Sequence, residues 1–510
     1  MFRTVQSAAL CGIKAEIIHV EADVGNGLPM FLMVGYLSTQ VKEAQERVKT
    51  AIKNSGFCMQ PKKITVNLSP ADLRKEGSGF DLPIAAAVLA SYGYIPQEAF
   101  HDVLLAGELS LNGEVRPIRG ILPMVRRAAA AGFRRCIVPK ENEREGAVIR
   151  EMRVIGVSTL REAVEYLNGN CEIKPAVTNI EEMLCTAAEN PEEDFKNING
   201  QAAAKRAAEV AVSGMHNLLL IGPPGAGKSM IAKCIPGILP GMTLDESLEV
   251  SEIYSVAGML PKDEPLVWKR PFRAPHHTIS AQALSGGGRI PKPGEISLAH
   301  RGVLFLDEMP EFQREAVEIL RQPLEERKVC ISRISGSFIY PADMMLVAAM
   351  NPCKCGYYPD RNRCSCTASE VHQYLRKISQ PLLDRMDISI EVPEIGYRDL
   401  TCAQTEESSG EIRERVLCAH EIQKERYAGT EIQFNSELKP ENIPEYCPLG
   451  REENRMMETA FEKLKLSARA YHRMIRVSRT IADLAGSRDV KCEHIGEAIC
   501  YRTAEQKFWN

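Results

Sequence analysis

Apolar runs alternate with amphipathic segments along most of the chain, and this alternation predicts a mixed α/β protein. In residues 1–168, runs such as KKITVNLSP and RRCIVPKEN are typical of strands, whereas LPMVRRAAAAGF is typical of a helix that Gly132 closes. From residue 200 to about 393 the pattern reads strand, glycine-rich loop, helix, strand, helix, strand. Residues 394–510 are mainly helical in pattern, with a loop around QFNSELKPENIPEYCPLG.

The region between the first two patterns is polar and acidic. Residues 169–199 include NPEEDFKN near their end, and such a composition predicts a linker. The chain therefore divides into an N-terminal domain at 1–168, this linker, a central domain at 200–393 and a C-terminal helical domain at 394–510. A length of 510 residues allows each of these domains to bury a core.

Charge and composition limit the possible functions. The net charge of -4 provides no global basic field for nucleic acid, so any DNA contact must come from local basic groups in a pore or on one face. Lys14 and Glu16 interrupt the region where a secretory signal would be apolar, and the longest apolar run, near IAAAVLASYGYI, is too short to span a bilayer. We therefore expect a soluble cytoplasmic protein with no membrane partner. Its 16 cysteines should be mostly reduced and, like Cys234 and Cys418, buried.

The segment HNLLLIGPPGAGKSM carries the clearest chemical pattern. LLLIG is typical of a buried parallel strand, and Gly222-x4-Gly227-Lys228-Ser229 follows it as in a phosphate-binding loop. Its glycines let backbone N–H groups approach phosphate oxygens, Lys228 would contact the β and γ phosphates, and the Ser229 hydroxyl would bind Mg²⁺. The alternative is a chance glycine-rich turn, which the flanking strand and helix disfavour. The predicted nucleotide-binding residues are Gly222, Pro223, Pro224, Gly225, Ala226, Gly227, Lys228 and Ser229.

Two further apolar strands end in polar residues. VLFLD ends at Asp307 and Glu308, where Asp307 would hold Mg²⁺ and Glu308 would act as general base toward the attacking water. DMMLVAAMN ends at Asn351, whose amide can position water beside the γ-phosphate. The alternatives are solvated acids at a strand end and an ordinary turn. After a phosphate loop, these residues predict a site for ATP and Mg²⁺.

Five long motifs lie between residues 200 and 486. They are GQAAAKRAAEVAVSGMHNLLLIGPPGAGKS, PGEISLAHRGVLFLDEMPEF, LVAAMNPCKCGYY, ISQPLLDRMDI and SARAYHRMIRVSRTIADLAG. Together they resemble the ComM/YifB family of Mg-chelatase-like AAA+ ATPases. The resemblance implies an AAA+ core with a parallel sheet, a C-terminal helical lid, and a homo-oligomeric ring, usually a hexamer, with ATP bound between neighbouring subunits.

The same resemblance assigns roles to two arginines. Arg385 in PLLDRMD matches the arginine finger, which neutralises the charge that develops on the neighbour's γ-phosphate, and Arg469 in SARAYHR matches the second sensor on the lid. Asn351 matches the first sensor. Gln380 and Ala470 stand where the family usually has glycine, and neither change removes a reactive group. From the residues alone, Arg385 could instead pair with a nearby aspartate, and Arg469 could belong to a solvated helix face.

The segments KEGSGFDLPIA and PIRGILPMVRRAAAAGFRRCIVPKENEREG resemble the α+β, S5-type proteolytic domain of Lon-type proteases. Those enzymes use a Ser–Lys dyad. The serine position falls at Phe80 or Asp81, and the lysine position falls at Leu122, which cannot act as a base. Ser78 lies nearby without a matched lysine. The resemblance therefore implies the fold without proteolysis, and we expect a ring-building or substrate-docking domain.

Three functions compete for such a motor. Members of the ComM group are DNA helicases that promote branch migration during recombination of incoming DNA. VCISRISGSFIYPAD lies where related ATPases place a hairpin in the ring pore, and Lys328 and Arg333 could contact phosphates of single-stranded or branched DNA. PFRAPHHTISAQALSGGGRIPKPG is either a second pore loop or a surface insertion. A Mg-chelatase motor subunit that remodels a protein partner is disfavoured by the Lon-like domain, and an ATP-dependent protease by the missing dyad.

The loop NPCKCGYYPDRNRCSC gathers four cysteines. Four thiolates match the number and softness of the ligands of tetrahedral Zn²⁺, although a single residue within each pair is shorter than the usual two to four. Two disulfides are disfavoured by a reducing cytoplasm, and four buried free thiols by the charged residues, glycine and proline between them. We therefore predict a Zn²⁺ site in loop 353–366, formed by Cys353, Cys355, Cys364 and Cys366.

Overall fold

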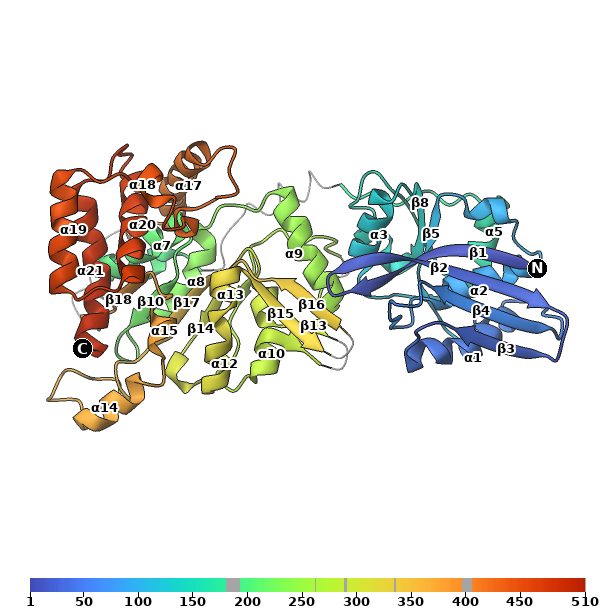
Figure 1. The fold of residues 1–510 in the computed structure, drawn as a ribbon, viewed down its shortest axis with the longest axis horizontal. Helices are drawn as coiled ribbons and strands as arrows, with labels where there is room; N and C mark the ends of the chain where they lie inside the picture. The colour runs from blue at the N-terminus through green and yellow to red at the C-terminus, as the bar shows by residue number, and fades with distance from the viewer. Residues whose placement is uncertain (180–192, 262, 289–290, 334–335, 397–405, 510) are drawn as a thin grey trace.

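The computed structural model describes residues 1–509 with the exception of 180–192, 262, 289–290, 334–335 and 397–405. The molecule is elongated, with the N-terminal domain at one end and the C-terminal helices at the other (Figure 1). The predicted mixed α/β fold is confirmed, and the central part of the chain contains a parallel sheet.

The N-terminal domain is built on a seven-stranded mixed sheet in the order β3-β4-β2-β1-β5-β8-β9. Helix α2 is buried along its whole length, because its apolar run DLPIAAAVLAS packs against β1 and β2. The predicted strands at KITVNLS and RCIVP are present, and Gly132 follows the predicted helix with a left-handed φ of 87°. The elements are β1 (Phe2–Cys11), β2 (Lys14–Gly25), β3 (Met30–Val34), α1 (Thr39–Asn54), β4 (Lys63–Ser69), α2 (Asp81–Ser91), η1 (Gln97–Phe100), β5 (Val103–Leu105), β6 (Glu108–Leu109), β7 (Val115–Arg116), α3 (Ile121–Ala130), β8 (Arg135–Pro139), η2 (Lys140–Asn142), α4 (Glu143–Gly146), β9 (Arg153–Val157) and α5 (Leu160–Leu167).

The central domain contains a five-stranded parallel sheet in the order β11-β14-β17-β10-β18. The inner strands β14, β17 and β10 are fully buried, as expected when a parallel sheet is covered on both faces. Two small hairpins, β12–β13 and β15–β16, leave this core. The elements are η3 (Phe195–Asn197), α7 (Ala202–Gly214), β10 (Leu218–Ile221), α8 (Lys228–Ile238), α9 (Leu244–Ala257), β11 (Phe272–Arg273), α10 (Ala281–Ser285), β12 (Gly286–Gly287), β13 (Lys292–Pro293), α11 (Glu295–Leu298), β14 (Val303–Leu306), η4 (Met309–Glu311), α12 (Arg314–Glu318), η5 (Ile319–Arg321), α13 (Pro323–Glu326), β15 (Lys328–Arg333), β16 (Gly336–Pro341), β17 (Met345–Met350), α14 (Ala368–Leu375), α15 (Gln380–Leu383) and β18 (Ile388–Glu391).

The predicted linker at 169–199 differs from the structure at its end. Residues 180–192 lie outside the described residues, but Phe195 is fully buried in the core of the central domain. Its backbone N–H donates to Ser409 Oγ at 2.9 Å. The packed chain therefore begins before residue 200, because one aromatic side chain anchors a segment whose acidic composition suggested solvent exposure.

The C-terminal domain is helical, as its sequence pattern predicts. Helix α20 packs against α7, α17 and α21, and α21 lies along β18, so this domain contacts the edge of the central sheet. Asp483 on α20 is fully buried and pairs with Arg426 and Arg479, which compensates its charge. The elements are α17 (Ser409–Arg426), η6 (Asn435–Glu437), α18 (Ile443–Tyr446), α19 (Arg451–Lys463), α20 (Ala468–Leu484) and α21 (Cys492–Trp509).

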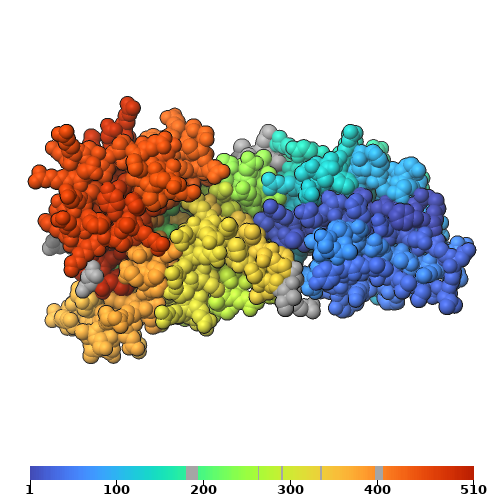
Figure 2. Space-filling view, viewed as in Figure 1, coloured from blue at the N-terminus to red at the C-terminus, as the bar shows by residue number. Residues whose placement is uncertain are grey.

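The N-terminal domain contacts the central domain at two places. Helix α3 packs against α9, where Ser255 Oγ donates to Glu145 Oε1 at 2.5 Å; burial raises the pKa of Glu145 although this bond acts in the opposite direction. The β1–β2 turn reaches the β15–β16 hairpin, so that a Cβ at Gly12 would lie 3.7 Å from Phe338 (Figure 1). The surface is continuous across this junction (Figure 2). The two contacts tie the N-terminal domain to the hairpin and to α9.

Two further observations concern expectations from composition. The described part of the chain has no helix with the length and apolar character needed to cross a membrane. Its cysteines form no disulfide within the described ranges, and Cys234 is buried as predicted. The prediction for Cys418 is wrong: this thiol is exposed, because it lies on the solvent-facing side of α17, whose buried face is formed by neighbours such as Val416 and Ala419.

Candidate nucleotide-binding site

Three neighbouring strands of the parallel sheet end in polar residues at one edge. β10 leads into Gly222, β14 into Asp307 and β17 into Asn351. β10 pairs with β17, and β17 with β14, in parallel register. Because the carboxyl ends of parallel strands meet at the same edge, the fold brings these three segments together.

The loop from Gly222 to Gly227 has a backbone that requires glycine. Gly225 and Gly227 have φ angles of 79° and 87°, and a Cβ at Gly222 would lie 2.2 Å from the carbonyl oxygen of Val392. Helix α8 begins at Lys228, and no side chain caps its first N–H groups. The free donors and the positive end of the helix fit the phosphates of a nucleotide such as ATP.

Lys228 is buried and points into this loop. Its ammonium donates to the carbonyl oxygens of Gly222 and Pro223 at 2.8 Å each, and to Asn351 Oδ1 at 3.1 Å. Burial lowers the pKa of Lys228 to about 8, although nearby carboxylates act in the opposite direction. The partners are neutral oxygens, and a phosphate oxygen would be a stronger acceptor for the same ammonium.

Ser229 and Asp307, which come from different elements, meet beside the loop. Ser229 Oγ donates to Asp307 Oδ2 at 2.7 Å, and Asp307 Oδ1 accepts from the Glu308 N–H at 3.0 Å. A hydroxyl and a carboxylate are oxygen ligands of the kind that Mg²⁺ prefers. The pair therefore fits the predicted Mg²⁺ ligands.

Glu308 is held in a left-handed backbone conformation with a φ of 52°, and its side chain is 56% exposed. Its carboxylate lies 3.8 Å from His277 Nδ1. Sequence reasoning did not single out His277. The available signal was its place soon after β11, the strand that pairs with β14 and therefore ends near Glu308.

The two predicted arginines lie away from the phosphate loop within one chain. Arg385 is 14% exposed, and its guanidinium donates to Glu325 at 2.5 Å and to the carbonyl oxygens of Arg321 and Pro381 at 3.1 and 2.6 Å. Arg469 is exposed near the start of α20, and no recorded contact within the described ranges joins it to the phosphate loop. Among the described residues, neither arginine thus has a recorded contact with the phosphate loop of its own chain.

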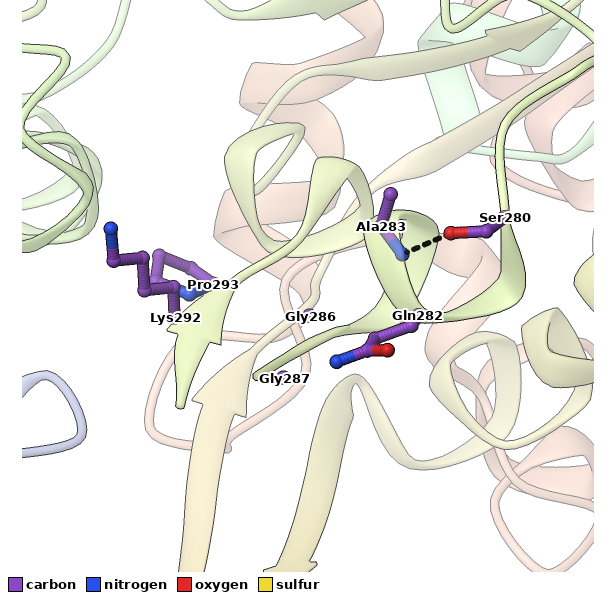
Figure 3. Close-up of a pocket in the computed structure, with 7 residues that line it drawn as sticks. All are labelled: Ser280, Gln282, Ala283, Gly286, Gly287, Lys292 and Pro293. Atoms are coloured by element: carbon purple, nitrogen blue, oxygen red, sulfur yellow. Dashed lines mark hydrogen bonds between the residues drawn. The ribbon is translucent and has the colours of Figure 1, made fainter. Parts of the chain in front are cut away.

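Helix α10 and the β12–β13 hairpin line a pocket of about 310 Å³. Arg333, at the end of β15, lies beside it, since a Cβ at Gly287 would be 3.0 Å from Arg333 Nη2. Figure 3 shows Gln282 next to Gly287, with Lys292 on the opposite strand of β12–β13. The tips of the predicted pore loops, residues 289–290 and 334–335, lie outside the described residues. The lining residues are Ser280, Gln282, Ala283, Gly286, Gly287, Lys292 and Pro293.

The four clustered cysteines converge in the loop after β17. Their Sγ atoms all lie within 4.8 Å of one another, and the distances from Cys353 to Cys355 and Cys364 are 3.3 and 3.8 Å. Four sulfurs around Zn²⁺ at about 2.3 Å would be separated by roughly 3.8 Å. The thiols therefore fit a tetrahedral metal site.

This cysteine loop also contacts the phosphate loop and the last helix. A Cβ at Gly356 would lie 2.5 Å from Pro224 Cδ, and the rings of Tyr358 and Phe508 are 6.3 Å apart. Cys353 is fully buried in the core formed with the central sheet. The loop thus fills the space between the nucleotide site and α21.

The positions that correspond to a protease dyad carry a different arrangement. Asp81 is fully buried and pairs with Arg47, whose Nε and Nη2 donate to its two oxygens at 2.8 and 3.0 Å. Leu122 is buried, and its backbone N–H donates to Glu145 at 3.0 Å. The recorded partner of the Ser78 hydroxyl is the carboxylate of Glu108. In a Ser–Lys dyad, a neutral amine takes the proton from the serine hydroxyl. A carboxylate is a weaker base than that amine, so it is a poor substitute for the lysine.

The chain matches three models of magnesium chelatase subunit ChlI. The magnesium chelatase model itself matches residues 194–400, the model of subunit ChlI of Mg-chelatase matches 20–142, and the ChlI C-terminal model matches 406–502. These ranges cover the N-terminal, central and C-terminal parts of the structure.

Known proteins give the same result over the full length. Competence protein ComM of Haemophilus influenzae is 43% identical over 502 residues, which cover 98% of this chain and 97% of that protein. Uncharacterized protein YifB of Escherichia coli is 40% identical over 506 residues, with 98% and 97% covered. Lon protease 2 of Bacillus subtilis is 28% identical over 143 residues, 27% of this chain and 25% of that protein.

The fold and the site define an AAA+ motor of the Mg-chelatase type. The chain belongs to the ComM/YifB family within that class.

Proposed function

We propose that this protein is an ATP-hydrolysing ring motor, located in the cytoplasm, that acts on single-stranded or branched DNA and promotes branch migration during recombination of DNA. The observation that carries the DNA proposal is the position of Arg333. It lies beside Gly287 in the pocket lined by α10 and the β12–β13 hairpin, in a chain whose net charge is -4. A local cation on a hairpin supplies a phosphate contact without a global basic field.

ATP hydrolysis would use the residues that meet at the sheet edge. Lys228 would neutralise phosphate charge, Ser229 and Asp307 would hold Mg²⁺, and Asn351 would orient the attacking water. Glu308 would accept a proton from that water, and its exposed carboxylate is free to turn toward the nucleotide. Ser229 and Asp307 would hold Mg²⁺, whose charge would offset the negative charge that develops on the phosphate oxygens.

A ring of identical subunits, which we propose to be a hexamer, would complete this site. Arg385 and Arg469 would reach ATP at subunit interfaces, Arg385 from the neighbouring chain as an arginine finger. The position of Arg385 supports this proposal, since its side chain lies against Glu325 and no recorded contact joins it to the phosphate loop of its own chain within the described residues.

The Lon-like domain would serve assembly or docking and would not hydrolyse peptides. The predicted nucleophile position, Phe80 or Asp81, offers no hydroxyl or thiol, and Leu122 at the predicted lysine position offers no base. The domain's contacts with α9 and with Phe338 of the β15–β16 hairpin instead make it a support for the face proposed to bind DNA.

Zn²⁺ would bind the four cysteines and act structurally. A tetrahedral site formed by four thiolates is closed to substrate. By fixing the loop, the metal would hold Gly356 against Pro224 of the phosphate loop and Tyr358 near α21.

The decisive experiment combines a labelled four-way DNA junction with ATP and Mg²⁺ and follows both strand exchange and phosphate release. We expect ATP-dependent branch migration and DNA-stimulated hydrolysis. Arg333→Glu should weaken both responses to DNA by about tenfold or more while hydrolysis without DNA persists, since a phosphate contact becomes a repulsion. Lys424→Glu is the matched control, because Lys424 is 79% exposed on α17, away from the hairpins.

A Mg-chelatase-like motor that remodels a protein partner is the alternative, favoured by the match to magnesium chelatase subunit ChlI over 194–400. ATP hydrolysis that responds to no single-stranded, duplex or branched DNA would contradict the DNA proposal and support this alternative.

A further inference from the structure

The backbone that carries Arg385 is held by the C-terminal domain. Arg473 on α20 donates through Nη1 to the carbonyl oxygens of Leu383, at 3.2 Å, and Met386, which lie on either side of Arg385 in sequence. Arg502 on α21 donates to the same Met386 oxygen at 3.4 Å. Helices α20 and α21 of the C-terminal domain therefore bind the backbone of residues 383–386, at the end of α15.

Arg473 makes these bonds from a buried position. Its side chain is 5% exposed, and Asp384 Oδ1 lies 3.6 Å from its Nη2. Its Nε and Nη2 have no hydrogen-bond partner within the described residues. A guanidinium placed in the interior loses its hydration, so an arginine whose recorded hydrogen bonds go to two carbonyls of one short segment indicates a role in fixing that segment.

A second contact fixes the same segment from the amino-terminal end of β10, the strand that leads into the phosphate loop. Asn217, which directly precedes β10, donates through Nδ2 to the Arg385 carbonyl oxygen at 2.9 Å. Its Oδ1 accepts from the Leu346 N–H on β17 at 2.9 Å, and its own carbonyl oxygen accepts from the N–H of Asp387. The strand that leads into the phosphate loop is thus bonded to the backbone of Arg385.

The side chain of Arg385, in contrast, is held by three bonds that a neighbouring chain could replace. Glu325 is 59% exposed, so this ion pair contributes little stability, and the other two acceptors are the carbonyl oxygens of Arg321 and Pro381. In the proposed ring, the guanidinium would exchange these bonds for a phosphate of the neighbour, while the bonds from Arg473 and Asn217 keep its backbone in place.

We propose that Arg473 is a positioning residue for the arginine finger and that it links the lid of one subunit to ATP hydrolysis in the next. This inference rests on the proposed ring motor. Arg473 lies one helical turn after Arg469 on α20, so a movement of α20 when Arg469 engages nucleotide is passed directly to the segment that carries Arg385. ATP binding at one subunit then adjusts the finger presented to its neighbour.

A double-mutant cycle on the full-length protein tests this inference. Arg473→Gln should lower kcat by about tenfold or more and leave KM within about threefold, because the ATP pocket of each chain keeps all its own groups. In an Arg385→Ala background, the same substitution should lower kcat by less than about twofold, because the finger that it positions is already gone.

Arg476→Gln is the matched control. Arg476 is also largely buried on α20, but its recorded hydrogen bond goes to the Ser436 carbonyl oxygen at 2.8 Å rather than to the finger segment. Its effect on kcat should be equal with and without Arg385. An effect of Arg473→Gln that is likewise equal in both backgrounds, or that appears mainly in KM, would overturn the positioning role.

A conservative variant covers the case in which Arg473→Gln does not fold. Arg473→Lys keeps the buried charge but replaces Nη1, which donates to both carbonyls, by an ammonium on a shorter side chain, so it should fold and still show the non-additive loss of kcat. Wild-type kcat in Arg385→Ala would overturn this inference together with the finger role. If Lys228→Ala were inactive in that same experiment, the ATPase proposal would stand by itself.

Discussion

The ammonium of Lys228 lies among three neutral oxygens in a loop shaped for phosphate. Lys228→Ala should abolish ATP binding, because the triphosphate loses this charge and the described part of the loop offers no other cation. Equilibrium binding of a fluorescent ATP analogue measures this loss of binding.

Glu308→Gln should bind the fluorescent ATP analogue normally but hydrolyse ATP slowly, because an amide cannot take the proton. Hydrolysis at the wild-type rate in Glu308→Gln would reject the role of Glu308.

The pKa of Lys228 makes ATP binding depend on pH. Burial lowers this pKa to about 8 in the empty site, and a bound triphosphate favours the ammonium, so binding draws in a proton above pH 8. At pH 8.5 we expect uptake of about three quarters of a proton per ATP and an affinity that declines as the pH rises further. Calorimetric titration in buffers of different ionisation enthalpy measures the uptake.

Lys228→Arg provides the control for this proton uptake. Arginine stays charged at pH 8.5, so any ATP that the variant binds should bring no proton through this position. Equal uptake in the wild type and in Lys228→Arg would show that another group titrates.

At the scale of elements, the cysteine loop makes the sharpest prediction. Purified wild-type protein should contain about one Zn²⁺ per chain, and Cys364→Ser combined with Cys366→Ser should lose it. ATP binding should survive within about tenfold, because the recorded bonds of Lys228 involve none of the cysteines. Metal analysis and the fluorescent ATP titration measure the two outcomes.

Two exposed cysteines outside the loop serve as the control for zinc loss. Cys58→Ser with Cys418→Ser removes the same number of thiols and should leave the metal content unchanged. A wild-type protein that is metal-free although its loop is ordered would refute the zinc site.

Elements that a short stretch of sequence determines could be predicted from the sequence. The strands before Gly222, Asp307 and Asn351 are short apolar runs that end in polar residues, and parallel pairing then requires these residues to meet. The backbone signal of Gly225 and Gly227 is equally local. Local pattern therefore sufficed for the part of the site that one sheet edge assembles.

Contacts between distant segments could not be predicted in the same way. His277 reaches Glu308 through the pairing of β11 with β14, and Arg473 reaches Met386 through the docking of α20. The local sequence around His277 and Arg473 resembles the sequence around a solvent-exposed residue. On α20, arginines recur at helical spacing, and their burial depends on the rest of the fold. Phe195 shows the same limit, since its acidic neighbours predicted exposure.

At the scale of the whole molecule, the N-terminal domain and the lid hold opposite sides of the motor core. The β1–β2 turn contacts Phe338 on the hairpin proposed to bind DNA, whereas α20 contacts the segment of the proposed finger. A movement of the core can thus reach both the substrate face and the neighbouring subunit. In the proposed ring, this arrangement would join neighbouring subunits, which makes the shared ATP site the property to test.

Mixed rings test whether the ATP site is shared. A Lys228→Ala subunit cannot bind ATP but still carries Arg385, and an Arg385→Ala subunit binds ATP but lacks the finger, which is worth on the order of 10³ in rate. In equal mixtures, random assembly leaves about one quarter of the interfaces with both groups, so about one quarter of wild-type ATPase activity should return. The control mixes Arg385→Ala with the double variant Lys228→Ala, Arg385→Ala, in which no interface has a finger and no activity should return. Phosphate release from rings whose mixing is verified by subunit exchange gives the measurement. If the first mixture stayed as inactive as the second, Arg385 would have to act within its own chain, and a released guanidinium would then need a path from Glu325 to its own phosphate loop.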